Sequence, residues 1–254
     1  MGLFDSHVHL DDAAFDPDRA DVLARARAAG VERMLTVGTD LASSRAAVAL
    51  AERHAGVYAA VAVHPHAAAD ASAETYTALE ELARHPRVVA IGETGLDFGG
   101  RSAPVEAQRE ALRAHQALAR ERGLPLIMHC RDAHAVLLEM LTEVGTPVVM
   151  HAFSGSVDVA RECAARGYFL SLAGPVTFKR ADHLAAVARE APASLLLVET
   201  DAPVLAPHPY RGRRNEPAYL RSIVERVAEI RGEAVDIVGE MTAANALRLF
   251  GISH

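Results

Sequence analysis

The chain has few of the features that mark disulfide-rich, thiolate-bound or membrane-spanning proteins. It holds only two cysteines, Cys130 and Cys163, with no Cys-x-x-Cys pair, so neither a disulfide scaffold nor a thiolate metal cage is expected. No apolar run approaches the ~18 residues that a membrane helix needs, and no secretory leader precedes the first apolar segment. These absences predict a protein of the reducing cytoplasm with no membrane association.

Positive charge is also in short supply. The 26 lysines and arginines are outnumbered by 33 aspartates and glutamates, which gives a formal net charge of −7. A protein whose whole surface attracts nucleic acid by releasing counterions is therefore excluded, and any phosphate ligand must meet a local positive site. Hydrophobic residues make up 50% of the chain and charged residues 23%, a composition typical of a globular protein with a buried core.

Short apolar, β-branched runs alternate with longer segments of helical period along the whole chain, a pattern typical of parallel strands joined by helices. No Gly-rich dinucleotide-binding turn follows the first run. We therefore expect one (β/α)8 TIM-barrel domain over residues 1–254. The strands are expected to begin near Leu3, Glu32, Val57, Val88, Pro125, Pro147, Tyr168 and Leu195.

The intervening helices carry recognisable signals. Asp16 and Pro17 predict the start of a helix that ends at Gly30. Apolar residues at helical spacing predict further helices over 133–144 and 220–227. The segment from Pro203 to Pro217 contains four prolines and no clear element, so it is expected to be a long loop after the eighth strand, of the kind that carries function.

Polar residues follow six of the expected strands at the point where each strand ends. Because the active site of such a barrel lies at the carboxyl ends of its strands, these residues are expected to converge. Any one of them has an ordinary explanation as a hydrogen-bonded histidine or a helix cap, but burying the whole set is costly without a cation. The sequence therefore predicts a metal site made from His7, His9, Glu93, His129, His151 and Asp201, with His64 at the end of the third strand beside it.

The motifs around these residues resemble those of the TatD family, metal-dependent hydrolases and deoxyribonucleases within the amidohydrolase-like barrels. The resemblance spans the chain from Leu3 to Phe250. Its motifs are Asp-Ser-His-Val-His-Leu-Asp at 5–11, Val-His-Pro-His at 63–66, Ile-Gly-Glu-Thr-Gly-Leu-Asp at 91–97, His-Cys-Arg-Asp-Ala at 129–133, His-Ala-Phe-Ser-Gly at 151–155, Glu-Thr-Asp-Ala-Pro at 199–203 and Pro-Tyr-Arg-Gly-Arg-Arg-Asn-Glu-Pro at 209–217.

This resemblance implies two divalent metal ions. One ion would be held by His7, His9, Glu93 and Asp201, and the second by Glu93, His129 and His151, with Glu93 as the bridge. The ligand types permit Zn, Mn, Co or Mg. Many related barrels bridge their metals with a carboxylated lysine, but the only lysine here is Lys179, past the seventh strand, so that bridge is excluded at the fourth strand.

The expected catalytic residues are Asp201, Glu93 and His64. Asp201 is the candidate general base on a metal-activated water, and His64 is expected to hydrogen-bond a substrate oxygen or move a proton. The loop after the eighth strand and a neighbouring turn supply cationic and amide groups for phosphate recognition. These substrate-binding candidates are Arg211, Arg213, Arg214 and Asn215, with Arg131 as a lesser one.

The function favoured is hydrolysis of DNA phosphodiester bonds, from a 3′ end and on single strands, as the resemblance implies; a small phosphodiester is the other substrate considered. Two alternatives stay open. The same metals would serve an amidohydrolase-like enzyme on a small amide, ester or lactone, and a non-catalytic nucleotide-binding barrel belongs to another class altogether. No obligate protein partner is indicated.

Overall fold

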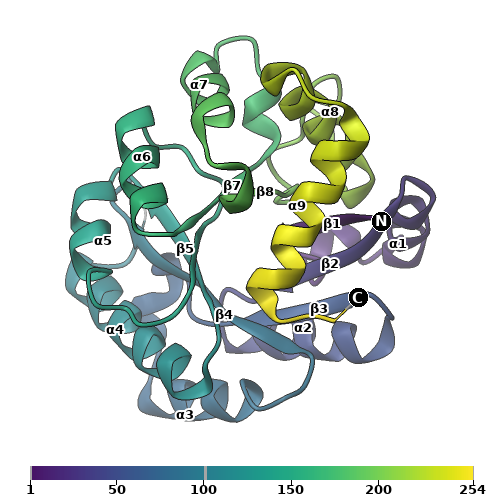
Figure 1. Cartoon of the computed structure of the whole chain (residues 1–254). Coiled ribbons are helices and arrows are strands. Elements are labelled where there is room, and N and C mark those ends of the chain that lie inside the picture. The colour runs from purple at the N-terminus through teal and green to yellow at the C-terminus, as the bar shows by residue number, and fades with distance from the viewer. Residues whose placement is uncertain (1, 100–101, 254) are drawn as a thin grey trace. The chain divides into compact units, whose positions relative to one another are not determined.

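The computed structural model describes residues 2–99 and 102–253. Its eight strands form one sheet in which each strand neighbours its successor in the sequence (Figure 1). The strands are β1 (Leu3–Val8), β2 (Val31–Val37), β3 (Val57–Val61), β4 (Val88–Asp97), β5 (Leu126–Arg131), β6 (Val148–Met150), β7 (Phe169–Leu172) and β8 (Leu196–Val198). The α-helices are α1 (Arg19–Ala28), α2 (Leu41–Arg53), α3 (Ala73–Leu82), α4 (Val105–Arg122), α5 (His134–Met140), α6 (Val157–Ala165), α7 (Asp182–Glu190), α8 (Leu220–Arg231) and α9 (Val235–Phe250).

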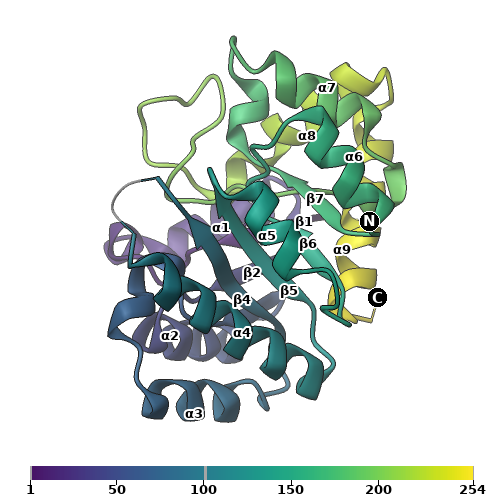
Figure 2. The ribbon, with the colours of Figure 1, turned by 90° about the vertical axis from the view of Figure 1, so that its left-hand side faces the viewer.

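The chain divides into two compact units, residues 1–35 together with 152–254, and residues 36–151. In the second unit β3, β4, β5 and β6 pair in parallel, and helices α4 and α5 lie over β4 and β5 (Figure 2). In the first unit β7 pairs in parallel with β8. The single domain expected over 1–254 stays a prediction, and its residues 1, 100, 101 and 254 lie outside the described part.

The backbone that follows β8 returns to β1. The amide of Asp201 donates to the carbonyl of His7 at 2.9 Å, and the amide of His9 donates to the carbonyl of Ala202 at 2.9 Å. The hydroxyl of Ser6 adds a bond to the carbonyl of Val198 at 3.0 Å. A sheet whose last strand bonds back to its first, with a helix after each strand, has the (β/α)8 barrel fold that the sequence predicts.

All eight strands begin within one residue of the expected positions, and the segment 203–216 contains no helix or strand, as expected. Two helices differ. Asp18, and not Asp16, precedes the first residue of α1, because residues 13–15 form a short 3-10 turn. Helix α5 ends at Met140, where the Thr142 hydroxyl bonds the Glu139 carbonyl at 2.8 Å and competes with the helical pattern.

Strand β4 extends beyond the predicted end at Glu93, which is a correction. After a register shift between Ile91 and Thr94 it continues beside β5, with Gly95 opposite His129 and Asp97 opposite Arg131. Gly95 makes this approach feasible, because its φ is +138° and a Cβ there would lie 2.1 Å from the carbonyl oxygen of His129. The strand therefore carries a second carboxylate, Asp97, along the same edge as His129.

Substituting Gly95→Ala should lower the free energy of unfolding by at least about 3 kcal/mol, because the new methyl group meets backbone that cannot rotate away. The matched control is Gly123→Ala after α4, where φ is +64° and nothing lies within 4 Å of the new Cβ, so only strain of about 1 kcal/mol is expected. Urea unfolding measures both. Equal losses in the two variants would contradict the close packing of β4 on β5.

Candidate metal centre

Two imidazoles and one carboxylate meet in the first unit, where β1 and the segment after β8 end; we call these residues the β1/β8 triad. The Nε2 atoms of His7 and His9 lie 3.3 Å apart, as expected for residues i and i+2 of a strand that point to one side. Asp201 Oδ1 lies 3.4 Å from His9 Nε2 and 3.8 Å from His7 Nε2. His7 is fully buried and Asp201 is buried, so these groups form a polar site shielded from water.

The second unit holds a cluster around the carboxylate of Glu93, which we call the Glu93 cluster. Its Oε1 atom lies 2.8 Å from His129 Nδ1, 2.8 Å from His151 Nε2 and 3.4 Å from His64 Nε2. Three imidazole nitrogens from three different strand ends thus converge on one oxygen atom of a side chain that is almost completely buried. Every member of this cluster was expected from the sequence to lie at such an end.

Electrostatics keep Glu93 ionised in spite of its burial. Burial opposes ionisation, but the imidazoles of His151 and His64 and the hydrogen bonds from His129 and His151 outweigh it and hold the pKa of Glu93 well below its usual value. Burial lowers the pKa of His64, although the Glu93 carboxylate works against that shift. The cluster therefore pairs a carboxylate with an imidazole that prefers to be neutral, which is the protonation state that metal binding requires.

Hydrogen bonds on the far side of each ring decide which imidazole can act as a ligand. The amide of His66 donates to His64 Nδ1 at 3.1 Å, so the proton of His64 sits on Nε2 and points toward Glu93 as a donor. In His129 the Nε2 atom lies 3.1 Å from Asp97 Oδ2 and the Nδ1 atom lies 2.8 Å from Glu93 Oε1, so each ring nitrogen faces a carboxylate. A cation bound at Nδ1 would leave the proton on Nε2, toward Asp97. His129 is thus set up as a ligand and His64 as a hydrogen-bond donor.

Asp97 and His66 were quoted in the sequence motifs but given no role there. Asp97 Oδ2 lies 3.1 Å from both His129 Nε2 and His66 Nε2, and its Oδ1 accepts from the amide of Gly99 at 2.7 Å. A carboxylate on the outer nitrogen of a ligating histidine fixes its tautomer and orientation. Alternation along an extended strand places 93 and 97 on one side, but only the register of β4 against β5 brings Asp97 beside His129.

A buried carboxylate anchors the β1/β8 triad from behind. Asp5 accepts from the Thr200 amide at 2.9 Å and the Thr200 hydroxyl at 2.5 Å. Burial raises the pKa of Asp5 to about 7, with the Thr200 hydrogen bonds opposing the rise. These bonds tie the segment before Asp201 to β1.

Asn215, an expected substrate contact, supports the same segment. It is fully buried, and its Nδ2 donates to the carbonyls of Thr200 and Val204 at 2.8 and 2.7 Å.

The structure separates the arginines that the sequence grouped together. Arg214 binds Asp18 with both ends of its guanidinium at 2.8 Å, which holds the pKa of Asp18 at about 2. Arg211 lies over the ring of Phe178, 4.1 Å from its centroid, and Arg213 is exposed. Arg131 is also exposed, and its side chain packs against Gly99.

Both donor sets fit a divalent cation. Imidazole nitrogen and carboxylate oxygen are the ligands that Zn, Mn and Co favour. His7, His9 and Asp201 bring three such atoms within 4.8 Å of one another, and His129 and His151 each place a ring nitrogen 2.8 Å from Glu93 Oε1. Burying this many imidazole and carboxylate groups costs desolvation free energy, and a bound cation would offset that cost.

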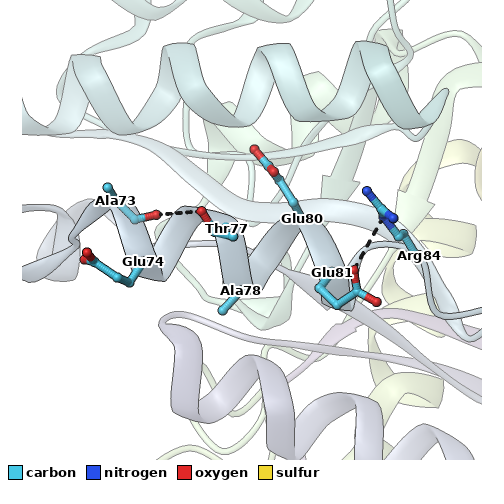
Figure 3. Close-up of a pocket in the computed structure, with 7 residues that line it drawn as sticks. All are labelled: Ala73, Glu74, Thr77, Ala78, Glu80, Glu81 and Arg84. Carbon is cyan, nitrogen blue, oxygen red and sulfur yellow. Dashed lines mark hydrogen bonds and ion pairs between the residues drawn. The ribbon is translucent and has the colours of Figure 1, made fainter.

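A hollow of about 520 Å³ lies along α3, lined by Ala73, Glu74, Thr77, Ala78, Glu80, Glu81 and Arg84 (Figure 3). It has three acidic side chains, no histidine and only local bonds, such as that from the Thr77 hydroxyl to the Ala73 carbonyl at 3.1 Å. In this hollow no imidazole faces a carboxylate, as happens in the β1/β8 triad and the Glu93 cluster, so it is not a candidate active site.

The chain is similar to proteins of one family along almost its full length. The family model described as TatD related DNase matches residues 4–251. The uncharacterized metal-dependent hydrolase YabD of Bacillus subtilis is 42% identical over 254 residues, which cover 99% of this chain and 100% of that protein. The 3'-5' ssDNA/RNA exonuclease TatD of Citrobacter koseri is 42% identical over 259 residues, with coverage of 99% and 100%.

The fold is shared with a solved structure of the same family. The crystal structure of YJJV, a TatD homolog from Escherichia coli K12, has a TM-score of 0.94 and 31% identity, over 99% of this chain and 98% of that one. Among the described residues no helix is both long and apolar enough to cross a membrane. These findings confirm the family resemblance and the fold class read from the sequence.

Replacing Asp97 by alanine should weaken binding of Mn²⁺ or Zn²⁺ by about 10- to 100-fold, because His129 loses the partner that orients its lone pair. Asp97→Asn keeps an acceptor oxygen and should lose less affinity. Calorimetric titration of the metal-free protein measures the constants directly. Wild-type affinity in Asp97→Ala would show that this carboxylate does not support a metal ligand.

A buried histidine outside the metal groups predicts a pH dependence of stability. His115 on α4 accepts from the amide of Val63 at 3.1 Å and bonds the Thr94 hydroxyl at 3.0 Å, next to His64 and Glu93. Burial lowers the pKa of His115 from 6.5 to about 4, so the unfolded chain takes up its proton first. Its contribution is complete above pH ~6.5 and should fall by about 3 kcal/mol as the pH drops toward 4.

Urea unfolding at pH 7 and pH 4.5 should therefore show a steeper loss for the wild type than for His115→Gln, which cannot titrate there. The exposed His183 provides the matched control, and His183→Gln should keep the wild-type pH dependence. The same slope in all three proteins would mean that His115 is not held neutral.

Proposed function

Because the chain belongs to the TatD family of metal-dependent hydrolases, we propose that it hydrolyses phosphodiester bonds of single-stranded DNA or RNA from the 3′ end. The observation that carries this function is that each unit gathers imidazoles and a carboxylate at its strand ends, in the β1/β8 triad and in the Glu93 cluster, within a chain that matches the family model over residues 4–251. The polarity and substrate rest on the relatives named as 3'-5' ssDNA/RNA exonucleases. The cytoplasmic location expected from the sequence stays a prediction.

We propose two divalent ions, with Mn, Zn, Co or Mg as candidates. The β1/β8 triad supplies His7, His9 and Asp201, and the Glu93 cluster supplies Glu93, His129 and His151; Glu93 is the proposed shared ligand, as the family resemblance implies. When bound, such ions lower the pKa of water, polarise the scissile phosphate and offset the charge that develops on it.

The side chains around the ligands then have separable roles. Asp201 accepts the proton of the attacking water, since its Oδ1 already lies within 3.4 Å of a ligand nitrogen and its backbone is fixed to β1. His64 presents the proton on Nε2 to a phosphate oxygen, because its Nδ1 is taken by the His66 amide. Asp97 holds the ring of His129 so that its Nδ1 stays aimed at Glu93.

The proposal divides the arginines by what they already contact. Arg211 and Arg213 are exposed and remain candidates for phosphate binding, as does Arg131. Arg214 and Asn215 donate to Asp18 and to backbone carbonyls, so we assign them to shaping the loop after β8. A small amide, ester or lactone as substrate remains the alternative that the assay below decides.

Changing Asp201→Asn should lower kcat for 3′-tailed single-stranded DNA at least about 100-fold, because the carboxamide cannot accept the proton. The fold should survive, since the backbone bonds of this residue do not involve its side chain. The exposed Asp236 on α9 provides the matched control, and Asp236→Asn should keep the wild-type rate.

The assay should use the metal-loaded protein on a panel of single-stranded DNA, RNA, a dinucleotide, a phosphomonoester and a neutral lactone. Metal-dependent release of nucleotides from the 3′ end is the expected result. Turnover confined to the lactone would contradict the proposed substrate and establish the alternative, and full activity in Asp201→Asn would remove this residue from the mechanism.

A further inference from the structure

The loops after β7 and β8 enclose a cavity of about 500 Å³ in the first unit, separate from the metal ligands. We call it the Phe178 groove. Its lining includes Phe178, Lys179, Arg180, Ala181, Leu184 and Arg211. From it we infer a binding site for the phosphodiester backbone of a single strand at nucleotides away from the cleaved bond, an inference that rests on the proposed function and extends it.

The two loops are joined by a hydrogen bond and by a close approach of their backbones. The amide of His208 donates to the Thr177 hydroxyl at 2.8 Å, and that hydroxyl donates to the Gly174 carbonyl at 2.7 Å. At Gly174 a Cβ would stand 1.8 Å from the carbonyl oxygen of Leu205, so only glycine permits this approach. The groove therefore has fixed walls, as a binding site needs.

The charge of the groove is the reverse of the charge of the whole chain. Three cationic side chains line it, Lys179, Arg180 and Arg211, and no acidic side chain does. In the part of the chain that the structure describes, none of the three forms an ion pair. An adjoining hollow of about 450 Å³ shares Phe178 and Lys179 with the groove, and its lining adds Arg226 and the acidic residues Asp182, Glu225 and Glu229. In a chain with a net charge of −7, the Phe178 groove thus offers three cationic side chains without an acidic neighbour in its lining.

The chemistry of the lining matches a nucleic acid strand. Lysine and arginine bind phosphate oxygens, and arginine does so with two parallel hydrogen bonds. The guanidinium of Arg211 stacked 4.1 Å from the centroid of Phe178 offers a flat surface of the kind on which bases stack. Loops after the seventh and eighth strands are also where barrels of this class commonly bind phosphate.

The groove follows the same strand ends as the catalytic residues. Its walls begin after Leu172 of β7 and Val198 of β8, and the segment that leads into its second wall starts at Asp201, whose carbonyl accepts from the Val204 amide at 3.0 Å. A strand whose terminal phosphodiester lies at Asp201 would extend into this groove, so longer substrates should gain contacts that a dinucleotide lacks.

The test measures binding of a fluorescein-labelled oligothymidine octamer with phosphorothioate linkages, which resists cleavage, to the metal-loaded protein across a range of salt concentrations. The double variant Lys179→Ala/Arg180→Ala should bind roughly tenfold more weakly. The slope of log K against log salt should fall by about 1.4, because each phosphate that is no longer neutralised lowers it by about 0.7. Arg113→Ala on α4, an exposed arginine outside the groove, is the matched control and should bind like the wild type.

Kinetics with cleavable substrates give a second readout. In the double variant the KM should rise more for an octamer than for a dinucleotide, whereas kcat should stay near the wild-type value. Unchanged affinity and salt slope in a folded double variant would overturn the groove as a strand-binding site. Failure of the proposed function would look different: the wild type would cleave neither the octamer nor the dinucleotide. The binding assay does not depend on cleavage, so it tests the groove separately.

Discussion

The Glu93 cluster depends on keeping one buried carboxylate ionised among imidazoles. Glu93 is 3% exposed, and a carboxylate without partners at such a position would take up a proton. Three imidazole nitrogens within 3.4 Å of its Oε1 atom prevent this. Each of these rings must present the correct nitrogen, so the contacts behind the rings matter as much as the cluster itself.

Those contacts come from the fold. The extension of β4 beside β5 brings Asp97 to the outer nitrogen of His129, and the turn after His64 brings the His66 amide to its Nδ1. His115 then ties Val63 to Thr94, the neighbours of His64 and Glu93. The β1/β8 triad has an equivalent support in Asp5, which binds the segment that presents Asp201. The scaffold therefore determines the protonation pattern of the site.

Much of this was predictable from local sequence patterns. Apolar runs located all eight strands, and polar residues at their ends are the members of the β1/β8 triad and of the Glu93 cluster. Asp97 escaped because its role depends on the register of β4 against β5, which the alternation of residues does not specify beyond the shift after Ile91. The arginines show the same limit: Arg214 binds Asp18 and Arg211 lies over Phe178, contacts that proximity along the chain does not specify.

The loops after β7 and β8 provide a second set of polar side chains with a proposed role different from that of the strand-end residues. Buried donors at the strand ends are suited to the reacting phosphate, whereas the exposed cations of the Phe178 groove are suited to the rest of a strand. This arrangement would let a negatively charged protein bind a polyanionic strand, because the Phe178 groove offers local positive charge.

The most direct test of the central claim is native mass spectrometry of the protein after equilibration with Mn²⁺ or Zn²⁺, with the bound ions counted for the wild type and for Glu93→Gln. The wild type should carry two ions per chain, and the variant should lose at least one while it remains folded. A wild-type chain that binds no ion, or a variant that binds two as tightly as the wild type, would contradict the account.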